Sequence, residues 1–241
     1  MKSPVGGGST LIEHLIALRQ TLLRCIIVTL LLFPAGYFAS DYVIRFLVRY
    51  TLPEVMGRLY FFTPMEVFMI QLKLGFVLAL AAAYPWNVFQ LWKFLMPALY
   101  EKERKMLGFL IVFSSLLFFG GAIFCGAFIL PLLMDFSASF ASPELMPMIG
   151  LADFLDLAGW MMLAFGLTFQ IPVLIIPLVK LGIVSTAKLK HLRPYVMTII
   201  LILAGILTPP DIFSQLMLAV PAWLLFETGL FIAAKFEKNK G

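Results

Sequence analysis

Residue types that commonly carry catalysis or bind metals are sparse in this chain. The two histidines, His14 and His191, have no second ligand at helical spacing, and the sequence contains no HExxH, no CxxC and no glycine-rich phosphate loop. Each histidine lies beside basic residues, where a solvated imidazole is commoner than a metal ligand. We therefore expect no enzyme, no metal site and no cofactor.

The densest mixture of aromatic and charged residues runs from Trp92 to Arg104 and includes Phe94, Glu101 and Glu103. One interpretation is an aromatic belt at a membrane surface, followed by a helix with glutamates in its first turn. The other is a binding surface, because a carboxylate beside an aromatic ring can pair with a guanidinium group and offer it a ring face. Both interpretations stay open at this point.

A few polar residues lie within or beside apolar stretches, where ionisable groups are rare and usually functional. Gln170 precedes Pro172, and its amide could either bond to a carbonyl that a proline leaves free or serve a function. Asp211 follows two prolines, where capping of a helix that begins at Ile212 is slightly favoured over direct function. Glu227 lies near the end of the last apolar stretch, where it could pair with a cationic headgroup or residue, although we favour simple extension toward the membrane surface.

The elements that must position these residues are membrane-spanning helices. The chain of 241 residues is 62% hydrophobic and 13% charged, whereas a soluble domain averages about 25% charged residues. Each of six nearly charge-free stretches can cross a bilayer, since about 20 apolar residues span its core. The stretches are 25–40, 74–92, 106–134, 157–179, 194–210 and 212–234. The predicted fold is an all-α, polytopic membrane protein with six spans.

The distribution of positive charge predicts the orientation, because short cytoplasmic segments are enriched in Lys and Arg. With the N-terminus inside, all but four of the 18 Lys and Arg residues fall on the cytoplasmic side. The four outside are Arg45, Arg49, Arg58 and Lys73. We therefore expect both termini in the cytoplasm, and the net charge of +5 reflects this asymmetry rather than nucleic-acid binding.

The remaining segments fit a single integral membrane domain over residues 1–241. Residues 9–24 predict an amphipathic helix that leads into the first span, with Thr10 and Glu13 as a capping box. Residues 41–72 and 132–157 predict caps on the outer ends of the spans, the first built from short helices. We expect short fifth and sixth helices, because only 15 residues, 194–208, precede the turn at Pro209.

Several motifs follow one another in order along these spans. They are His14-Leu15-Ile16 with Leu18-Arg19, Thr63-Pro64-Met65-Glu66-Val67-Phe68, Tyr84-Pro85, Gln90-Leu91-Trp92-Lys93-Phe94, Pro97-Ala98-Leu99-Tyr100, Glu103-Arg104, Phe165-Gly166, Arg193-Pro194-Tyr195 and Leu207-Thr208-Pro209-Pro210-Asp211-Ile212-Phe213-Ser214-Gln215. Together they resemble the TatC family, the multispanning core subunit of the twin-arginine protein translocase, over about residues 11 to 235.

The resemblance implies a concave membrane protein of the bacterial inner membrane that binds twin-arginine signal peptides of folded proteins. It further implies export driven by the proton-motive force, single-span TatA- and TatB-type partner subunits, surrounding membrane lipid, and several copies within a larger complex. Neither a cofactor nor a covalent reaction is implied.

Family site residues carry over to matching positions of this sequence. Glu103 would pair with the arginines of the signal peptide, and Phe94 and Arg19 would line the same cytoplasmic surface. A carboxylate accepts two parallel hydrogen bonds from a guanidinium group, and this bidentate contact favours Arg over Lys. Thr208 and Gln215 match the family's polar cluster that contacts the small subunits, although capping at the turn is an alternative role.

Two positions depart from the family pattern. The usual acid of the first helix falls on Ala17, and Glu13, one helical turn earlier, could partly replace it. An acid common in the fourth span falls on Gln170, which keeps hydrogen bonding but cannot exchange a proton. These changes raise the hypothesis of a divergent paralogue with weakened signal recognition.

Two other classes of protein remain as alternatives. An ion-coupled small-solute transporter would place ionisable groups and broken helices at the membrane midplane, whereas the mid-span stretches here offer only Gln170. A structural assembly scaffold would keep its subunit contacts without binding signal peptides.

Overall fold

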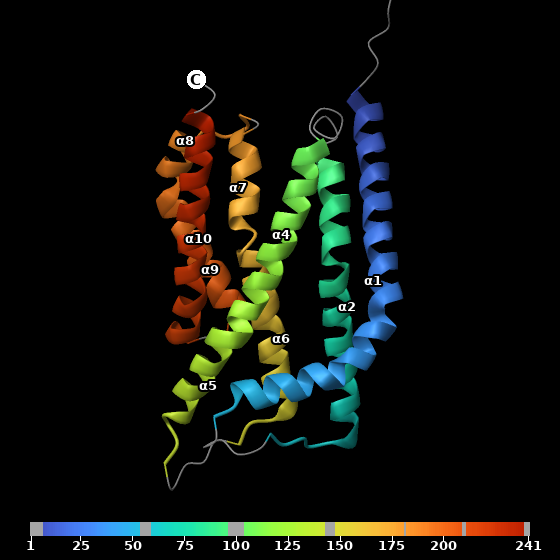
Figure 1. Cartoon of the computed structure of the whole chain (residues 1–241), viewed down its shortest axis with the longest axis vertical. Helices are drawn as coiled ribbons and strands as arrows, with labels where there is room; N and C mark the ends of the chain where they lie inside the picture. The colour runs from blue at the N-terminus through green and yellow to red at the C-terminus, as the bar shows by residue number, and fades with distance from the viewer. Residues whose placement is uncertain are drawn as a thin grey trace, which may run out of the picture. The chain divides into compact units, whose positions relative to one another are not determined.

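The computed structural model describes residues 7–53, 59–95, 104–142, 148–180, 182–208 and 211–238. Every regular element in these residues is helical, which confirms the predicted all-α class for the described part of the chain (Figure 1). In chain order the elements are α1 (Gly7–Thr51), α2 (Pro64–Leu95), α4 (Arg104–Phe124), the π-helical turn η2 (Cys125–Ile129), α5 (Leu130–Ala138), α6 (Leu151–Thr168), α7 (Ile171–Lys180), α8 (Thr186–His191), α9 (Arg193–Leu207) and α10 (Ile212–Lys238).

Five helical stretches of the described residues are long and apolar enough to cross a membrane. They are Ile12–Thr51, Pro64–Phe94, Gly108–Ala138, Leu151–Lys180 and Ile212–Lys235. The helix predicted as the fifth span is α9, which is short as expected, with 15 residues. The prediction of a short sixth helix is wrong, because α10 has 27 residues. It continues past Glu227, whose charge is paired with Arg193 rather than ending the helix.

The first helix is longer than the sequence pattern indicated. Thr10 lies inside α1, which begins at Gly7, so the capping box predicted for Thr10 and Glu13 is wrong. The residues from Gly7 to Thr10 include no proline that would interrupt the helix before Thr10. At its other end α1 continues to Thr51, so residues 41–51 extend a long helix where we expected short ones.

The chain divides into two compact units, and each is described separately. The first contains the described residues up to Asp41 together with 71–115, and the second contains 42–70 and the described residues from Leu116 onward. In the first unit α1 and α2 lie side by side (Figure 1). A Cβ atom on Gly36 would collide with the carbonyl oxygen of Gly75, so the two backbones meet at paired glycines. Small residues allow such close approach of membrane helices.

The second unit has a continuous apolar core between α4, α5, α6 and neighbouring helices. Leu130, Phe154, Met161 and Phe165 are among its fully buried side chains. Glycine again sets the closest approach, because a Cβ atom on Gly121 would lie 2.7 Å from the carbonyl oxygen of Phe165. These contacts hold α4 against α6.

A single π-helical turn joins α4 to α5 within one continuous stretch. The N–H of Leu130 donates to the carbonyl of Cys125, five residues earlier, in place of the usual four-residue spacing. Pro131, which follows directly, has no N–H to donate. The wider turn lets the helix accommodate this proline without ending, as π-turns inside α-helices commonly do.

The last four helices pack together on one side of the second unit, where α10 lies beside α7 and α9 (Figure 1). A Cβ atom on Gly229 of α10 would lie 2.9 Å from the Cα of Pro172, so this crossing is also tight. Near the α8 end, the N–H of Thr186 donates to Glu237 at 3.1 Å. At the opposite end Phe136 of α5 stacks on Phe213 of α10, with ring centroids 4.2 Å apart.

Candidate functional site

The start of α1 lies against the end of α2 in the first unit. The His14 imidazole stacks on the Phe94 ring, with centroids 4.5 Å apart and planes at 28°. His14 is exposed and Phe94 is half-buried. The structure therefore places the Phe94 ring beside the turn of α1 that carries Glu13 and His14.

Helical spacing decides how the other predicted residues lie around this contact. Glu13 is exposed and directly precedes His14, whereas Arg19 is exposed five residues later. At about 100° per residue, Arg19 points about 140° away from His14 around the helix axis. Ala17 lies four residues after Glu13, so both share a face. Glu13 lies in the same turn of α1 as His14, the residue that stacks on Phe94, and Arg19 lies further along α1 on another face.

Glu103, the residue predicted to pair with arginine, lies outside the described residues. It directly precedes Arg104, the first residue of α4. The hydroxyl groups of Tyr84 in α2 and Ser114 in α4 are hydrogen-bonded at 3.1 Å. Tyr84 lies ten residues before Phe94 in α2, and Ser114 lies ten residues after Arg104 in α4. Ten residues of helix are about 15 Å long. The first residue of α4 therefore lies at the same end of the first unit as Phe94.

Gln170 lies at a helix break rather than inside a regular helix. α6 ends at Thr168 and α7 begins at Ile171, since Pro172 has no N–H and its ring crowds the Thr168 carbonyl. The backbone N–H of Gln170 donates to Leu167, and the side-chain Nε2 donates to the Gly166 carbonyl at 3.3 Å. The buried side-chain amide thus takes the place of the Gln170 backbone N–H at the Gly166 carbonyl, and not at the Thr168 carbonyl that Pro172 leaves free.

Thr208 and Gln215 both bond to carbonyls near the end of α9. The buried Thr208 hydroxyl donates to Ala204 at 2.8 Å, and Gln215 Nε2 donates to Leu201 at 2.9 Å. A Cβ atom on Gly205 would lie 3.1 Å from this Nε2, so glycine makes room for the amide. Both polar side chains thus bond to carbonyls of α9, and the Gln215 bond ties α10 to α9.

Asp211 caps α10, as the sequence slightly favoured. Its Oδ1 accepts the N–H of Ser214 at 2.7 Å, and its carbonyl accepts the N–H of Gln215 at 3.1 Å. Ser214 itself is fully buried, and its Oγ has no hydrogen-bond partner among the described residues.

An ion pair joins α9 to α10. Arg193 Nη2 lies 2.6 Å from Glu227 Oε2, with side-chain exposures of 43% and 30%. Glu227 therefore pairs with a cationic residue, which was the less favoured of its two interpretations. The partners are 34 residues apart, and no local pattern could have found them.

Glu66 is a second polar centre that we did not single out, although the sequence contains a capping-box pattern at Thr63 and Glu66. The carboxylate accepts the N–H groups of Phe62 at 2.7 Å, Thr63 at 3.4 Å and Ala152 at 3.2 Å. Thr63 and Glu66 form the capping-box pattern at the start of α2, with Pro64 at its first position. The Ala152 bond adds the start of α6 to this cluster.

Among the described residues no three His, Cys, Asp or Glu side chains gather as they would around a metal ion. The Phe94 ring and the Glu13 carboxylate are each of a type that can contact a cationic group.

Comparison with known proteins points to one family. A family model described as Sec-independent protein translocase protein (TatC) matches residues 13–221. The chain is 36% identical to the TatC of Haemophilus influenzae over 239 residues, which is 98% of this chain and 93% of the relative. It is 37% identical to the TatC of Escherichia coli K12 over 235 residues, 96% of this chain and 90% of the relative.

Solved structures agree with the sequence relatives. A crystal structure of the twin-arginine translocase receptor TatC in DDM is similar with a TM-score of 0.83 and 28% sequence identity. The similarity covers 91% of this chain and 99% of the crystallised one.

Proposed function

The chain belongs to the TatC family of Sec-independent protein translocase proteins, and we propose that it binds twin-arginine signal peptides where α1 begins and α2 ends. The chain is a translocase subunit and not an enzyme. The observation that carries the proposal is the stacking of His14 on Phe94. This contact lies at the end of the first unit at which α4 begins, and it involves the turn of α1 that carries Glu13. Glu103 directly precedes the first residue of α4.

In the proposed complex each arginine of the peptide has a distinct anchor. Glu103 accepts bidentate hydrogen bonds from one guanidinium group. The exposed edge of the Phe94 ring packs against the planar face of that guanidinium group. Glu13 supplies the second carboxylate, since it shares a helix face with Ala17, where the family usually has an acid. Arg19 lies further along α1 and borders the surface without contacting the same guanidinium group.

We also propose that this surface faces the cytoplasm of a bacterial cell. Both termini then lie on the cytoplasmic side of the inner membrane, and the short helix α9 is the fifth of six spans. Support comes from the second unit, whose Lys180, Lys188, Lys190, Arg193 and Lys235 lie on the helix ends that meet near α8. The opposite end carries Asp135 and Asp153 as well as Arg45 and Arg49, so cationic residues are more numerous at the α8 end. This asymmetry agrees with the enrichment of Lys and Arg in cytoplasmic segments.

The proposed partners are single-span subunits of the TatA and TatB type, which would dock at the ends of α9 and α10. Ile206 and Ile212 flank Thr208 and Gln215 there and are 73% and 77% exposed. A partner helix with one polar side chain could cover these apolar residues and bond to the polar pair. Transport of the folded cargo, driven by the proton-motive force, would take place in a complex with several copies of this chain.

The decisive experiment is site-specific photocrosslinking of a labelled twin-arginine peptide to membranes that contain this protein. Probes at Phe94 and Glu103 should crosslink the peptide, and Glu103→Ala should weaken binding by about tenfold or more, because charge-assisted bonds are lost. Gln215→Ala is the matched control, since it removes a polar side chain at the proposed partner site and should leave peptide binding unchanged.

A twin-lysine peptide controls for charge alone, because lysine cannot make the two-point contact. Equal crosslinking of both peptides would contradict the proposal. If Glu103→Ala left binding intact while complexes with small subunits persisted, the chain would be an assembly scaffold.

The two departures from the family pattern suggest a divergent paralogue as the second candidate. Ala17 removes one carboxylate from the proposed surface, and Gln170 bonds to Gly166 without an exchangeable charge. Vesicles that contain this chain and its partner subunits should then export twin-arginine cargo slowly. Export at an ordinary rate would refute the paralogue hypothesis and leave Glu13 as the substitute acid, which Glu13→Gln would test.

A further inference from the structure

The last part of α1 separates its residues sharply into two faces. Val43, Ile44, Leu47 and Val48 pack into the core of the second unit, and Leu47 is only 5% exposed. The other face carries Tyr42, Arg45, Phe46, Arg49 and Tyr50, which line a pocket of about 340 Å³. This volume lies at the small end of the range for ligand sites.

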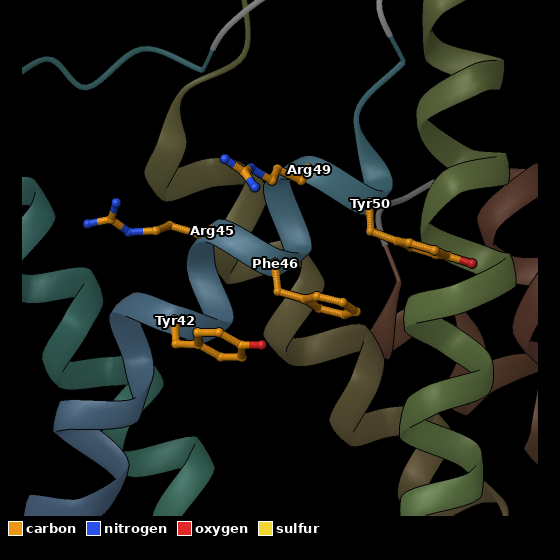
Figure 2. A pocket seen from close by; sticks show the side chains of 5 residues that line it. All are labelled: Tyr42, Arg45, Phe46, Arg49 and Tyr50. Atoms are coloured by element: carbon orange, nitrogen blue, oxygen red, sulfur yellow. The ribbon is translucent and has the colours of Figure 1, made fainter.

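The exposed face combines cationic and aromatic groups in two rows. Figure 2 shows the Arg45 and Arg49 guanidinium groups along one edge and the three rings along the other. Tyr42 is 76% exposed and Tyr50 is 55% exposed. Arginines four residues apart repel one another on a helix, so an anion between them would stabilise the arrangement. Asp41, four residues before Arg45 in the same helix, adds one negative charge near this pair.

The position of this segment indicates a membrane surface. In the second unit, the stretch from Tyr42 to Thr51 runs across the direction of α6 rather than along it (Figure 1). Helices that lie in the plane of the interface bury one apolar face and carry Arg on the polar one, and tyrosine is enriched at the level of the lipid headgroups. Under the proposed topology this is the outer leaflet, where Lys and Arg serve no topological purpose.

From these observations we propose that the Tyr42–Tyr50 face binds the phosphate headgroup of an anionic phospholipid. Arg45 and Arg49 contact the phosphate oxygens, and the Tyr42 and Tyr50 hydroxyl groups face the glycerol and ester oxygens. The Phe46 ring packs against the first carbons of an acyl chain. This site is independent of the signal-peptide surface, because it depends only on residues of the second unit.

The test uses the full chain, purified, stripped of lipid and placed in mild detergent. Phosphatidylglycerol, cardiolipin and phosphatidylcholine are titrated separately, and bound lipid is counted by native mass spectrometry. The anionic lipids should bind and phosphatidylcholine should not. The double variant Arg45→Gln/Arg49→Gln should bind phosphatidylglycerol about 25-fold more weakly, at about fivefold per arginine. Lys73→Gln, which removes another cation predicted on the same side, should bind as the unchanged protein does.

Two further arms separate the possible sources of the anion and the possible loss of folding. Excess inorganic phosphate should not displace bound phosphatidylglycerol, because the aromatic side chains add binding free energy through contacts with the lipid that a free phosphate ion cannot make. Arg45→Lys/Arg49→Lys keeps the charge and should give an intermediate affinity. Circular dichroism checks that both double variants are folded, and if the Gln variant is not, the affinity of the Lys variant decides the outcome.

Equal binding of phosphatidylglycerol by Arg45→Gln/Arg49→Gln and the unchanged protein would overturn the proposal. So would equal retention of phosphatidylcholine. If lipid binding is unchanged while the same double variant loses a copurifying subunit with an acidic segment, the face is a protein contact and not a lipid site.

Discussion

The Glu66 carboxylate connects the segment before α2 to the start of α6. It accepts N–H groups from Phe62, Thr63 and Ala152, and the neighbouring Tyr60 exchanges backbone hydrogen bonds with Ile149 and Leu151. The start of α2 and the start of α6 are therefore fixed to one another through the chain that precedes α2.

Glu66→Gln should lower the Tm of the detergent-solubilised protein, because an amide is a weaker acceptor for three N–H groups than a carboxylate. Glu66→Ala should lower it further, since all three donors lose their partner. Thermal denaturation followed by circular dichroism measures both. Glu13→Gln, at an exposed position of α1, is the control and should leave the Tm unchanged; an equal effect of Glu13→Gln would contradict the assignment.

The Arg193–Glu227 pair offers a second test at this scale. A double-mutant cycle with Arg193→Gln and Glu227→Gln should give a coupling free energy of up to about 1 kcal/mol, because both side chains are partly exposed and screened. Chemical denaturation in mild detergent supplies the four free energies of unfolding. A coupling of zero would mean that the two charges interact with water and headgroups rather than with one another.

Residue patterns in the sequence succeeded where the partner is local and failed where it is remote. The pattern Thr-x-x-Glu occurs at Thr10 and again at Thr63, and only the second forms a capping box. Pro64 makes the difference, since it fixes a helix start directly after Thr63, whereas Gly7 to Thr10 contains no such signal. The Ala152 bond to Glu66 and the Arg193 bond to Glu227 depend on tertiary packing that no spacing rule encodes.

At the scale of the element, glycine determines how closely the helices approach. Gly36 meets Gly75, Gly121 meets Phe165, and Gly229 meets Pro172, each at a distance that a side chain would violate. The sequence predicted the helices but not these crossings, because the sequence alone does not distinguish a glycine at a crossing from any other glycine. Gly108, Gly120, Gly159 and Gly182 have open space where a Cβ atom would stand, with no atom of a neighbouring segment within 4 Å, and are not contact points.

Gly36→Ala should destabilise the first unit by about 1–3 kcal/mol, the usual effect of overpacking. The added methyl group would meet backbone atoms of α2, which cannot rotate away. Gly120→Ala is the matched control in α4 and should be neutral or stabilising by up to about 1 kcal/mol, since alanine favours helix. Denaturation in detergent compares the two, and an equal loss in both variants would contradict the crossing.

At the scale of the whole molecule, the sequence predicted which stretches are apolar helices but not how they divide into compact units. Five of the six predicted stretches form helices long enough to span a membrane. The unit boundary falls inside α1, α2 and α4, so it follows no linker or change in composition. The candidate peptide surface was predicted through the family resemblance, and the structure added the stacking of His14 on Phe94.

The proposed orientation can be tested in intact cells with cysteines introduced into a variant that lacks Cys25 and Cys125. Ser139→Cys, at the exposed turn after α5, should react with a membrane-impermeant maleimide added outside. Lys188→Cys, in α8, should react only after the membrane is opened. The reverse pattern would invert the proposed topology, and labelling of both from outside would mean that the second unit is not inserted as proposed.

The shortness of α9 has a consequence for how the protein is made. With 15 residues, this helix is too short to partition into the lipid core by itself as it leaves the ribosome, since spanning segments need about 20. Its hydrogen bond from Gln215 and its ion pair with Glu227 both come from α10. We therefore expect α9 to wait at the insertion machinery until α10 has been synthesised, so that the two enter the bilayer as one hairpin.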